Sequence, residues 1–466
     1  MTPATLSFAD PLRRQRGSVL IIVLWICLGL VVLVLYFADS TNSELQAAAN
    51  RVGEIEARQA VAAGTRYAAN ILNNYAIDGV VPDSGIAPDP NADYYAEALR
   101  VGNDTGDPQF WFIGRDVNNL PTTDPMFCLV DEASKLNLNT ATAAMLTALP
   151  MANMTSDFAA AIVGWRTRQS QSSGSALSSA YSTLDPPRLN KGAPFESVEE
   201  LRLVYGATLD LLFGEDTNLN GTLDPNEDDG DQSPPHDNQD GQLQPGMFEY
   251  VTAFSNQPTT TRTGGSRVNI SNLAPNNPNF QRLTALLTRR GITAERGARI
   301  LQNLNSARPQ RTFTCVADFM LASGMTESEF ALIHTSIMGS SSVGLVNVNT
   351  ASETVLACIP GIGLSSAASL VTYRLANPTA LTSLVWITHV LSPAAIRRAG
   401  PYITDQSYQF SADIAAVGRF GRGYHREKVV FDTTMGTPRI IFRQDLTSLG
   451  WALGTQVRKT LKTANP

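Results

Sequence analysis

The stretch SVLIIVLWICLGLVVLVLYFA, residues 18–38, contains no charged side chain. It decides the fold because it determines whether the chain has a membrane-spanning helix. A helix of about 20 apolar residues is long enough to cross a hydrocarbon core of roughly 30 Å. Arginines within residues 13–16 precede the run, and Asp39 and Glu44 follow it. The positive-inside rule then places the N-terminus in the cytoplasm and the rest of the chain outside. A secretory signal normally has a shorter apolar core and small residues before its cut, so we expect a retained anchor, with a cleaved signal as the alternative.

The composition excludes several classes of function. The chain has 466 residues, 43% of them hydrophobic, and a formal charge of −7. This content favours globular domains, whereas the net negative charge argues against a broad nucleic-acid-binding surface. The cysteines form no CxxC pair, so zinc and redox motifs are absent, and three of them leave room for at most one disulfide: Cys128, Cys315 and Cys358. The four histidines are isolated and no catalytic motif is present, so we do not expect an enzyme.

The pattern beyond the anchor predicts one long helix and two groups of strands. Residues 39–77 are rich in Ala, Glu, Arg and Leu and lack Pro, so the helix should run from about 18 to 77. Pro, Gly, Asp and Asn dominate 78–108, which indicates a loop. Aromatic and β-branched runs predict strands on both sides of a helical middle, namely QFWFIGRDV (109–117), PMFCLVDEA (125–133), FEYVTAFS (248–255), YQFSADIAAVGRF (408–420), REKVVFDTT (426–434) and PRIIFRQDL (438–446).

The helical middle contains three weakly similar units. KLNLNTATAAMLTALP (135–150) resembles LVNVNTASETVLACIP (345–360), and RVNISNLA (267–274) is a shorter version. The third unit resembles a helix-hairpin-helix, with Thr350 or Asn349 capping a helix that ends near Cys358 and a glycine turn at 360–363. DNA-binding versions place basic residues after the turn, but here Leu364 is followed by two serines. We therefore expect a packing scaffold rather than a DNA-binding motif.

An acidic segment, DTNLNGTLDPNE at 216–227, matches the spacing of an EF-hand calcium loop. Calcium prefers oxygen ligands, and the glycine at the sixth position, Gly221, permits the sharp turn such a loop needs. The predicted ligands, the last of them bidentate, are Asp216, Asn218, Asn220, Thr222 through its carbonyl, Asp224 and Glu227. A possible second site comprises Asp229, Asp231, Asp237 and Asp240. The alternative is a solvated acidic linker, because the same residue types are common in disordered loops.

Taken together, the order of these features resembles the K-type minor pseudopilins of type II secretion systems. The resemblance rests on the leader ending in Arg16-Gly17, the anchor continuing into a long helix, DEASKLNLNTAT at 131–142, NVNTAS and IPGIG. It implies an α+β, pilin-like fold with an antiparallel sheet and a large inserted helical domain. The implied domains are a leader (1–17), a transmembrane and periplasmic helix (18–77), a first β part (78–135), a mostly helical insert (136–400), a second β part (401–454) and a tail (455–466).

The same resemblance implies how the chain is processed and what it assembles with. A prepilin peptidase would cut between Gly17 and Ser18 and leave the apolar helix on the mature protein. Most relatives carry Glu at mature position five, where this chain has Ile22. A carboxylate in the membrane is costly, and that Glu is understood to meet the subunit above, so its absence implies a tip subunit. The implied partners are the I- and J-type minor pseudopilins, the cofactor is calcium, and the location is the inner membrane with the bulk in the periplasm. The alternatives are a minor pilin of a type IV pilus and a membrane-tethered, competence-type DNA-binding protein.

Overall fold

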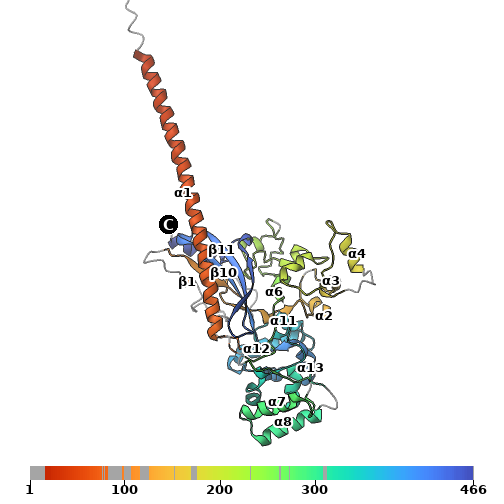
Figure 1. Cartoon of the computed structure of the whole chain (residues 1–466). Helices are drawn as coiled ribbons and strands as arrows, with labels where there is room; N and C mark the ends of the chain where they lie inside the picture. The colour runs from red at the N-terminus through yellow and green to blue at the C-terminus, as the bar shows by residue number, and fades with distance from the viewer. Residues whose placement is uncertain are drawn as a thin grey trace, which may run out of the picture.

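One helix and one sheet set the shape of the molecule (Figure 1). The computed structural model describes residues 16–75, 77, 79–81, 97–98, 106–115, 125–151, 153–168, 176–230, 232–261, 264–271, 273–307 and 312–464. Helix α1 (Arg16–Tyr75) is 60 residues long, which at 1.5 Å per residue makes it about 90 Å in length. Its first half stands clear of the other elements and carries exposed apolar side chains from Val19 to Phe37. Within the described ranges it is the one helix long and apolar enough to span a membrane.

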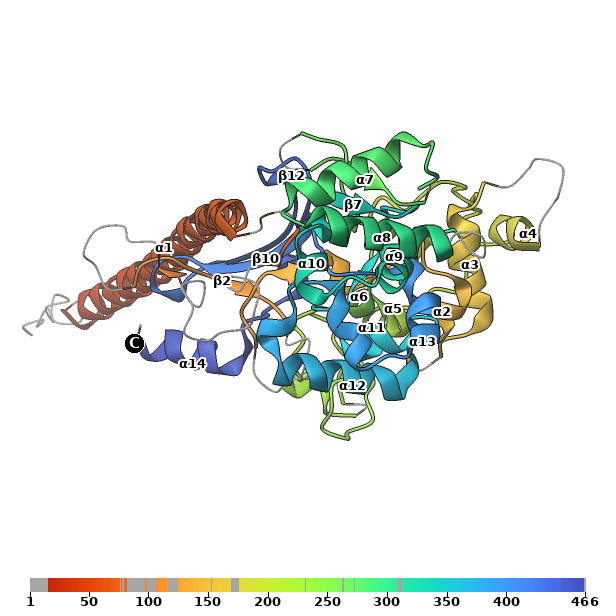
Figure 2. The same ribbon diagram turned by 90° about the horizontal axis from the view of Figure 1, so that it is seen from below.

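The second half of α1 lies against an antiparallel sheet built from both ends of the chain. The strands are β1 (Glu97–Ala98), β2 (Gln109–Ile113), β3 (Val130–Asp131), β10 (Gln409–Val417), β11 (Tyr424–Asp432) and β12 (Arg439–Asp445). Their order is β1-β2-β10-β11-β12, and β3 also pairs with β10. Gly64 lets the helix approach closely, because a Cβ there would lie 2.9 Å from Ile414 Cγ2. Strand β10 thus joins distant parts of the sequence beneath α1 (Figure 2).

Two separate hydrophobic clusters lie in the described residues. One joins α1, β2, β10, β11 and the segment before α14 (Gly454–Ala464), with Phe112, Ile414 and Leu453 among its buried members. The other runs from Leu136 to Ile403 and holds the helical middle of the chain. The long middle segment therefore has its own core and leaves and rejoins the sheet next to strand β10.

The middle segment contains three pairs of short parallel strands with helices between them. The two strands of each pair are far apart in the sequence: β4 (Leu136–Asn137) pairs with β5 (Val251–Thr252), β6 (Val268–Asn269) with β7 (Ile337–Met338), and β8 (Val346–Asn347) with β9 (Ile403–Thr404). The α-helices between these strands are α2 (Ala143–Thr147), α3 (Ser156–Arg166), α4 (Ala176–Ser182), α5 (Leu209–Phe213), α6 (Met247–Tyr250), α7 (Pro278–Arg289), α8 (Ala294–Ala307), α9 (Val316–Ser323), α10 (Glu327–Ala331), α11 (Glu353–Ala357), α12 (Gly363–Ala376) and α13 (Pro393–Ala399).

Repeated side-chain contacts explain the repeated sequence. The Oδ1 of Asn137, Asn269 and Asn347 each accepts the backbone N–H two residues further on, at 2.8 to 2.9 Å. Arg166 donates to the carbonyls of residues 138 and 141, and Arg374 donates to the equivalent carbonyls of residues 348 and 351. The recurring Asn therefore shapes the turn after each short strand, and the recurring Arg satisfies the carbonyls of that turn.

Several local predictions were wrong in detail. The run 248–255 is a strand only at Val251–Thr252, because Met247–Tyr250 forms a buried helical turn. In this turn the ring centroid of Phe248 lies 5.1 Å from that of Phe213. Tertiary packing here overrides strand propensity. The run 125–133 is a strand only at Val130–Asp131, since Asp131 accepts a hydrogen bond from Ala133 N and begins a 3-10 turn.

The predicted cap of the third unit was also wrong. Ser352 caps α11 by accepting from Val355 N, while Thr350 donates to Asp131 and Asn349 donates to Leu381 O. All four cysteines are free thiols. The helix predicted at 18–77 extends to Tyr75.

Candidate metal centre

The acidic loop is an insertion between two helical turns of the first unit. It leaves after α5 (Leu209–Phe213) and returns at α6 (Met247–Tyr250). Its two ends are tied together where Glu215 N donates to Gln244 O at 3.0 Å and Gly246 N donates to Phe213 O at 2.7 Å. The loop therefore emerges from and rejoins the helical segment at one point, which leaves its own residues free to form a compact turn.

The first half of the loop turns around the carboxylate of Asp216. Its Oδ1 accepts from Asn220 N and its Oδ2 accepts from Gly221 N, both at 2.9 Å. Gly221 has φ +72°, a conformation that favours glycine, and a Cβ there would lie 2.7 Å from the Arg115 side chain. Asn218 Oδ1 also accepts from Asn220 N, at 3.0 Å. The side chains predicted at positions one, three and five thus face the same turn.

Glu227 closes the loop from its other end. Its Oε1 accepts from Thr217 N at 3.0 Å, and its Oε2 accepts from Asp224 N at 3.1 Å. The residue is 1% exposed, as is Asp216. Burial, and next the nearby charge of Asp216, raise the pKa of Glu227 to about 8. Two buried carboxylates therefore lie near each other, an arrangement that a bound cation would stabilise.

The inner surface of the loop is rich in oxygen atoms. Asp224 Oδ2 accepts from the amide nitrogens of Asn218 and Asn220, at 2.7 and 2.9 Å, and the buried hydroxyl of Thr222 has no hydrogen-bond partner. A cation would need both amides rotated so that oxygen faces it in place of nitrogen, a rotation that keeps the amide shape. Among the described residues no three His, Cys, Asp or Glu side chains form a metal cluster. The fit to calcium therefore depends on the amide and carbonyl oxygens together with the carboxylates.

The acidic residues that follow the loop make local hydrogen bonds. Asp237 accepts from the backbone of Asp229 and of Gly230, and Asp229 accepts from Ser233. Asp240 accepts from Gln244 at 2.9 Å. Asp231 lies outside the described residues. A second metal site in this segment stays a prediction.

Two arginines that the sequence reasoning missed hold the loop on the sheet. Arg115, which follows β2, donates to Leu219 O at 3.0 Å and to Glu249 at 2.8 Å. Arg426 on β11 is fully buried, donates to Leu219 O at 2.8 Å and pairs with Asp413 at 2.6 Å. Neither arginine lies near the loop in sequence, so no local pattern could have identified it. The loop is consequently part of the contact between the inserted segment and the sheet.

The positions predicted for processing lie at the start of the long helix. Gly17 and Ser18 belong to the first turn of α1, and Ile22 follows about one turn later. The Ile22 side chain is 56% exposed. Residues 1–15 of the predicted leader lie outside the described residues. The predicted cut therefore falls at the beginning of α1, whose first half carries exposed apolar side chains.

Comparison with known proteins gives a family match over part of the chain and a weak likeness to a solved structure. The family model described as type II secretion system (T2SS), protein K, matches residues 116–212, which run from the end of β2 to α5. Comparison with curated protein sequences gives no match. Among solved structures, a chain of the GspK-GspI-GspJ complex from the enterotoxigenic Escherichia coli type 2 secretion system is 10% identical, with a TM-score of 0.38, and the match covers 87% of this chain and 99% of that chain. That likeness is too weak to carry an argument of its own. Residues 116–212, which lie in a chain with an N-terminal apolar helix and an antiparallel sheet, therefore match the protein K family of type II secretion systems.

Proposed function

We propose that this chain is a K-type minor pseudopilin that occupies the tip of the pseudopilus and assembles there with I- and J-type minor pseudopilins to support export across the outer membrane. The observation that carries the proposal is the K-family match, which starts directly after β2 and covers the first unit of the inserted segment. A bulky inserted segment beside the pilin-like sheet favours an end position, because a subunit inside a filament must leave room for neighbours on both sides.

The anchor supports the same assignment. In this proposal residues 18–38 sit in the inner membrane, prepilin peptidase removes residues 1–17, and the head lies in the periplasm. Ile22 gives the mature helix no carboxylate with which to meet a subunit above it. A buried apolar position costs nothing in lipid, whereas an unpaired carboxylate would be expensive.

The repeats of the inserted segment are proposed to act as a helix-hairpin-helix-like scaffold. Arg374, the basic residue of the third unit, is 4% exposed and donates to Val348 O and Ala351 O. The guanidinium group of Arg374 therefore binds backbone carbonyls inside the fold and is not exposed to contact a DNA phosphate. The turn from Pro360 to Ser366 contains no Lys or Arg. These contacts favour a structural role for the repeats over DNA binding.

Calcium is proposed to clip the loop 216–227 and so hold the insert on the sheet. When bound, calcium would neutralise the buried carboxylates of Asp216 and Glu227 and draw oxygens from Asn218, Asn220, Thr222 and Asp224. Because Arg115 and Arg426 both donate hydrogen bonds to the carbonyl of Leu219, ordering the loop also orders its contact with β11. The ion therefore has a structural role in this proposal.

Co-purification tests the assembly. The full chain, tagged at its C-terminus, is co-expressed with the I- and J-type pseudopilins of the same genome and is purified from detergent-solubilised membranes. We expect a ternary complex that survives 0.5 M salt, because the exposed apolar half of α1 offers contacts that salt does not screen. A J-type or I-type partner that never co-purifies would contradict the tip assignment. Salt-dependent retention on DNA with a steep slope would favour the competence-type alternative.

A further inference from the structure

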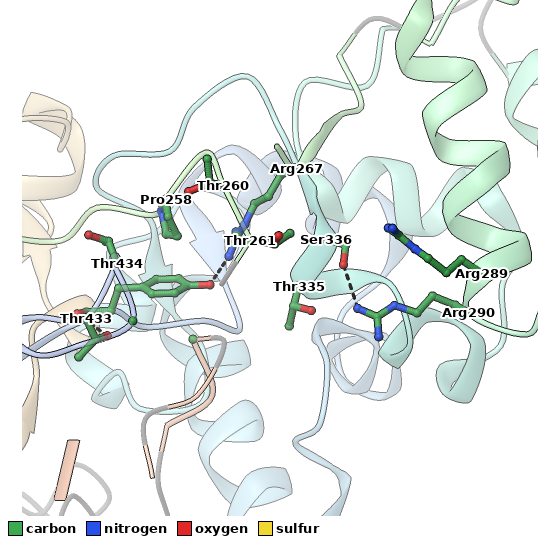
Figure 3. A pocket seen from close by; sticks show the side chains of 13 residues that line it. Pro258, Thr260, Thr261, Arg267, Arg289, Arg290, Thr335, Ser336, Thr433 and Thr434 are labelled. Atoms are coloured by element: carbon green, nitrogen blue, oxygen red, sulfur yellow. Dashed lines mark hydrogen bonds between the residues drawn. The ribbon is translucent and has the colours of Figure 1, made fainter. Parts of the chain in front are cut away.

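A pocket lies beyond the end of β11, which is the end opposite to Arg426 and the acidic loop, and its described lining consists of hydrogen-bond donors without an acidic residue. It has a volume of about 370 Å³ and lies between the segment 258–267, the end of α7, the turn before β7 and the turn after β11 (Figure 3). Among the residues that the structure describes, its lining contains three arginines, five threonines, one serine and one tyrosine, and no Asp or Glu. Almost every polar group that faces this pocket can therefore donate a hydrogen bond.

Arg267 is the innermost cation of the pocket. It is 4% exposed, one guanidinium nitrogen donates to the Tyr408 hydroxyl, and its centre lies 5.3 Å from the Tyr408 ring centroid. The other two guanidinium nitrogens, Nε and Nη1, are buried and have no hydrogen-bond partner. A buried charge with unsatisfied donors is costly unless a counter-charge is supplied. Arg267 thus has donors available for an anion.

Two further arginines reach the same pocket from the end of α7. Arg290 donates to the Ser336 hydroxyl at 3.2 Å, and Figure 3 shows Arg289 beside it. Neither forms an ion pair with a carboxylate of the described residues. Two acids near the pocket, within the described part of the chain, make contacts elsewhere: Asp405 pairs with His334 at 2.7 Å, and Asp432 accepts from Thr434 at 2.8 Å. The pocket therefore keeps an excess of positive charge.

From these contacts we infer that the pocket binds a tetrahedral oxyanion of the phosphate type, as the free ion or as a small phosphate monoester. The donors come from separate elements on several sides, which suits a tetrahedral anion better than a flat carboxylate. Guanidinium groups bind phosphate through paired, charge-assisted hydrogen bonds. The volume is at the lower end of the range for small-molecule sites, so it leaves room for a small ester group beside the anion. This site is separate from the calcium loop and does not depend on the secretion function.

Titration of the purified full chain in detergent tests the inference. Inorganic phosphate and glycerol 3-phosphate are the two probes, and sodium chloride keeps the ionic strength constant in every sample. We expect saturable heat of binding for phosphate, and a tighter monoester would show that the ester space is used. The double variant R289Q/R290Q should weaken binding at least about tenfold, because each lost charge-assisted hydrogen bond accounts for roughly that factor. Arg289 and Arg290 are exposed, so this variant should fold.

Matched variants separate the site from general charge attraction. R299Q removes an exposed arginine of α8 that does not line the pocket, and it should leave the affinity unchanged. R267Q should abolish binding, and circular dichroism of that variant establishes that it is folded before the result is used. Absence of saturable binding for both probes would overturn the inference. So would equal loss of affinity in R299Q and R289Q/R290Q, which would mean that the anions respond to net charge alone.

Discussion

Replacing Glu227 by Gln should raise the stability of the protein when calcium is absent and lower it when calcium is present. The pKa of this buried carboxyl is raised to about 8 from an ordinary value of 4.5. An acid whose pKa is raised in the folded state destabilises that state as the pH climbs from the unfolded value to the folded one. Without calcium, the penalty should therefore begin near pH 4.5, reach about 3 kcal/mol at pH 7 and level off above pH 8.

Gln is the neutral counterpart of the protonated side chain, so the variant should escape this penalty. In chelator we expect E227Q to melt at a higher temperature than the wild type at pH 8.5 and at nearly the same temperature at pH 5. In 1 mM calcium the order should reverse, because the wild-type carboxylate can ligate the ion and the amide is a weaker ligand. A ligand that binds only the folded state raises its apparent stability, and calcium should therefore stabilise the wild type more as the pH rises.

Thermal melts of the full chain in detergent at pH 5, 7 and 8.5 provide the measurement. E295Q, which neutralises an exposed acid of α8, is the matched control and should follow the wild type under all conditions. If chelator leaves the wild-type melting temperature unchanged at every pH, the loop is a linker and the reasoning is refuted. A variant that is less stable than the wild type by the same amount with and without calcium would also refute it, because Glu227 would then have only a structural role.

Three further predictions concern other parts of the chain. Gly17→Leu should leave the leader attached, and equal gel mobility in cells with and without prepilin peptidase would show that the wild type is not cut there. Arg426→Met should lower the free energy of unfolding by about 3–5 kcal/mol in urea melts, because it removes a fully buried partner and leaves the carboxylate of Asp413, which is 14% exposed, unpaired. Adding Asp413→Asn should restore part of the loss. Burial raises the pKa of Asp131 to about 6, so the stability of the wild type should fall as the pH rises from 4 to 6. Asp131→Asn should make stability depend less on pH in this range, and an unchanged pH dependence in the variant would contradict the assignment.

The sequence predicted the elements whose signal lies within a few neighbouring residues. The apolar helix, the strands β2, β10, β11 and β12 and the acidic turn follow from local composition and period, which short-range sterics and burial impose directly. It was wrong where packing changes a local preference, as at Phe248, whose contact with Phe213 favours a helical turn in a strand-like run. It was also wrong about the cap of α11, because Thr350 is drawn to Asp131 more than 200 residues away.

What the sequence determined by itself was the spacing of the oxygen-bearing side chains in the loop 216–227, for which calcium is proposed, and the apolar helix long enough to cross a membrane. Both depend on the order of residues within one segment. Only the tertiary structure decided what holds these parts in place. Arg115 reaches Leu219 from just after β2 and Arg426 reaches it from β11, and Arg267 meets Arg290 and Tyr408 in one pocket. The physical reason is that charge pairing and hydrogen bonding act across space, and residues brought together by strand order leave no periodic trace in the chain.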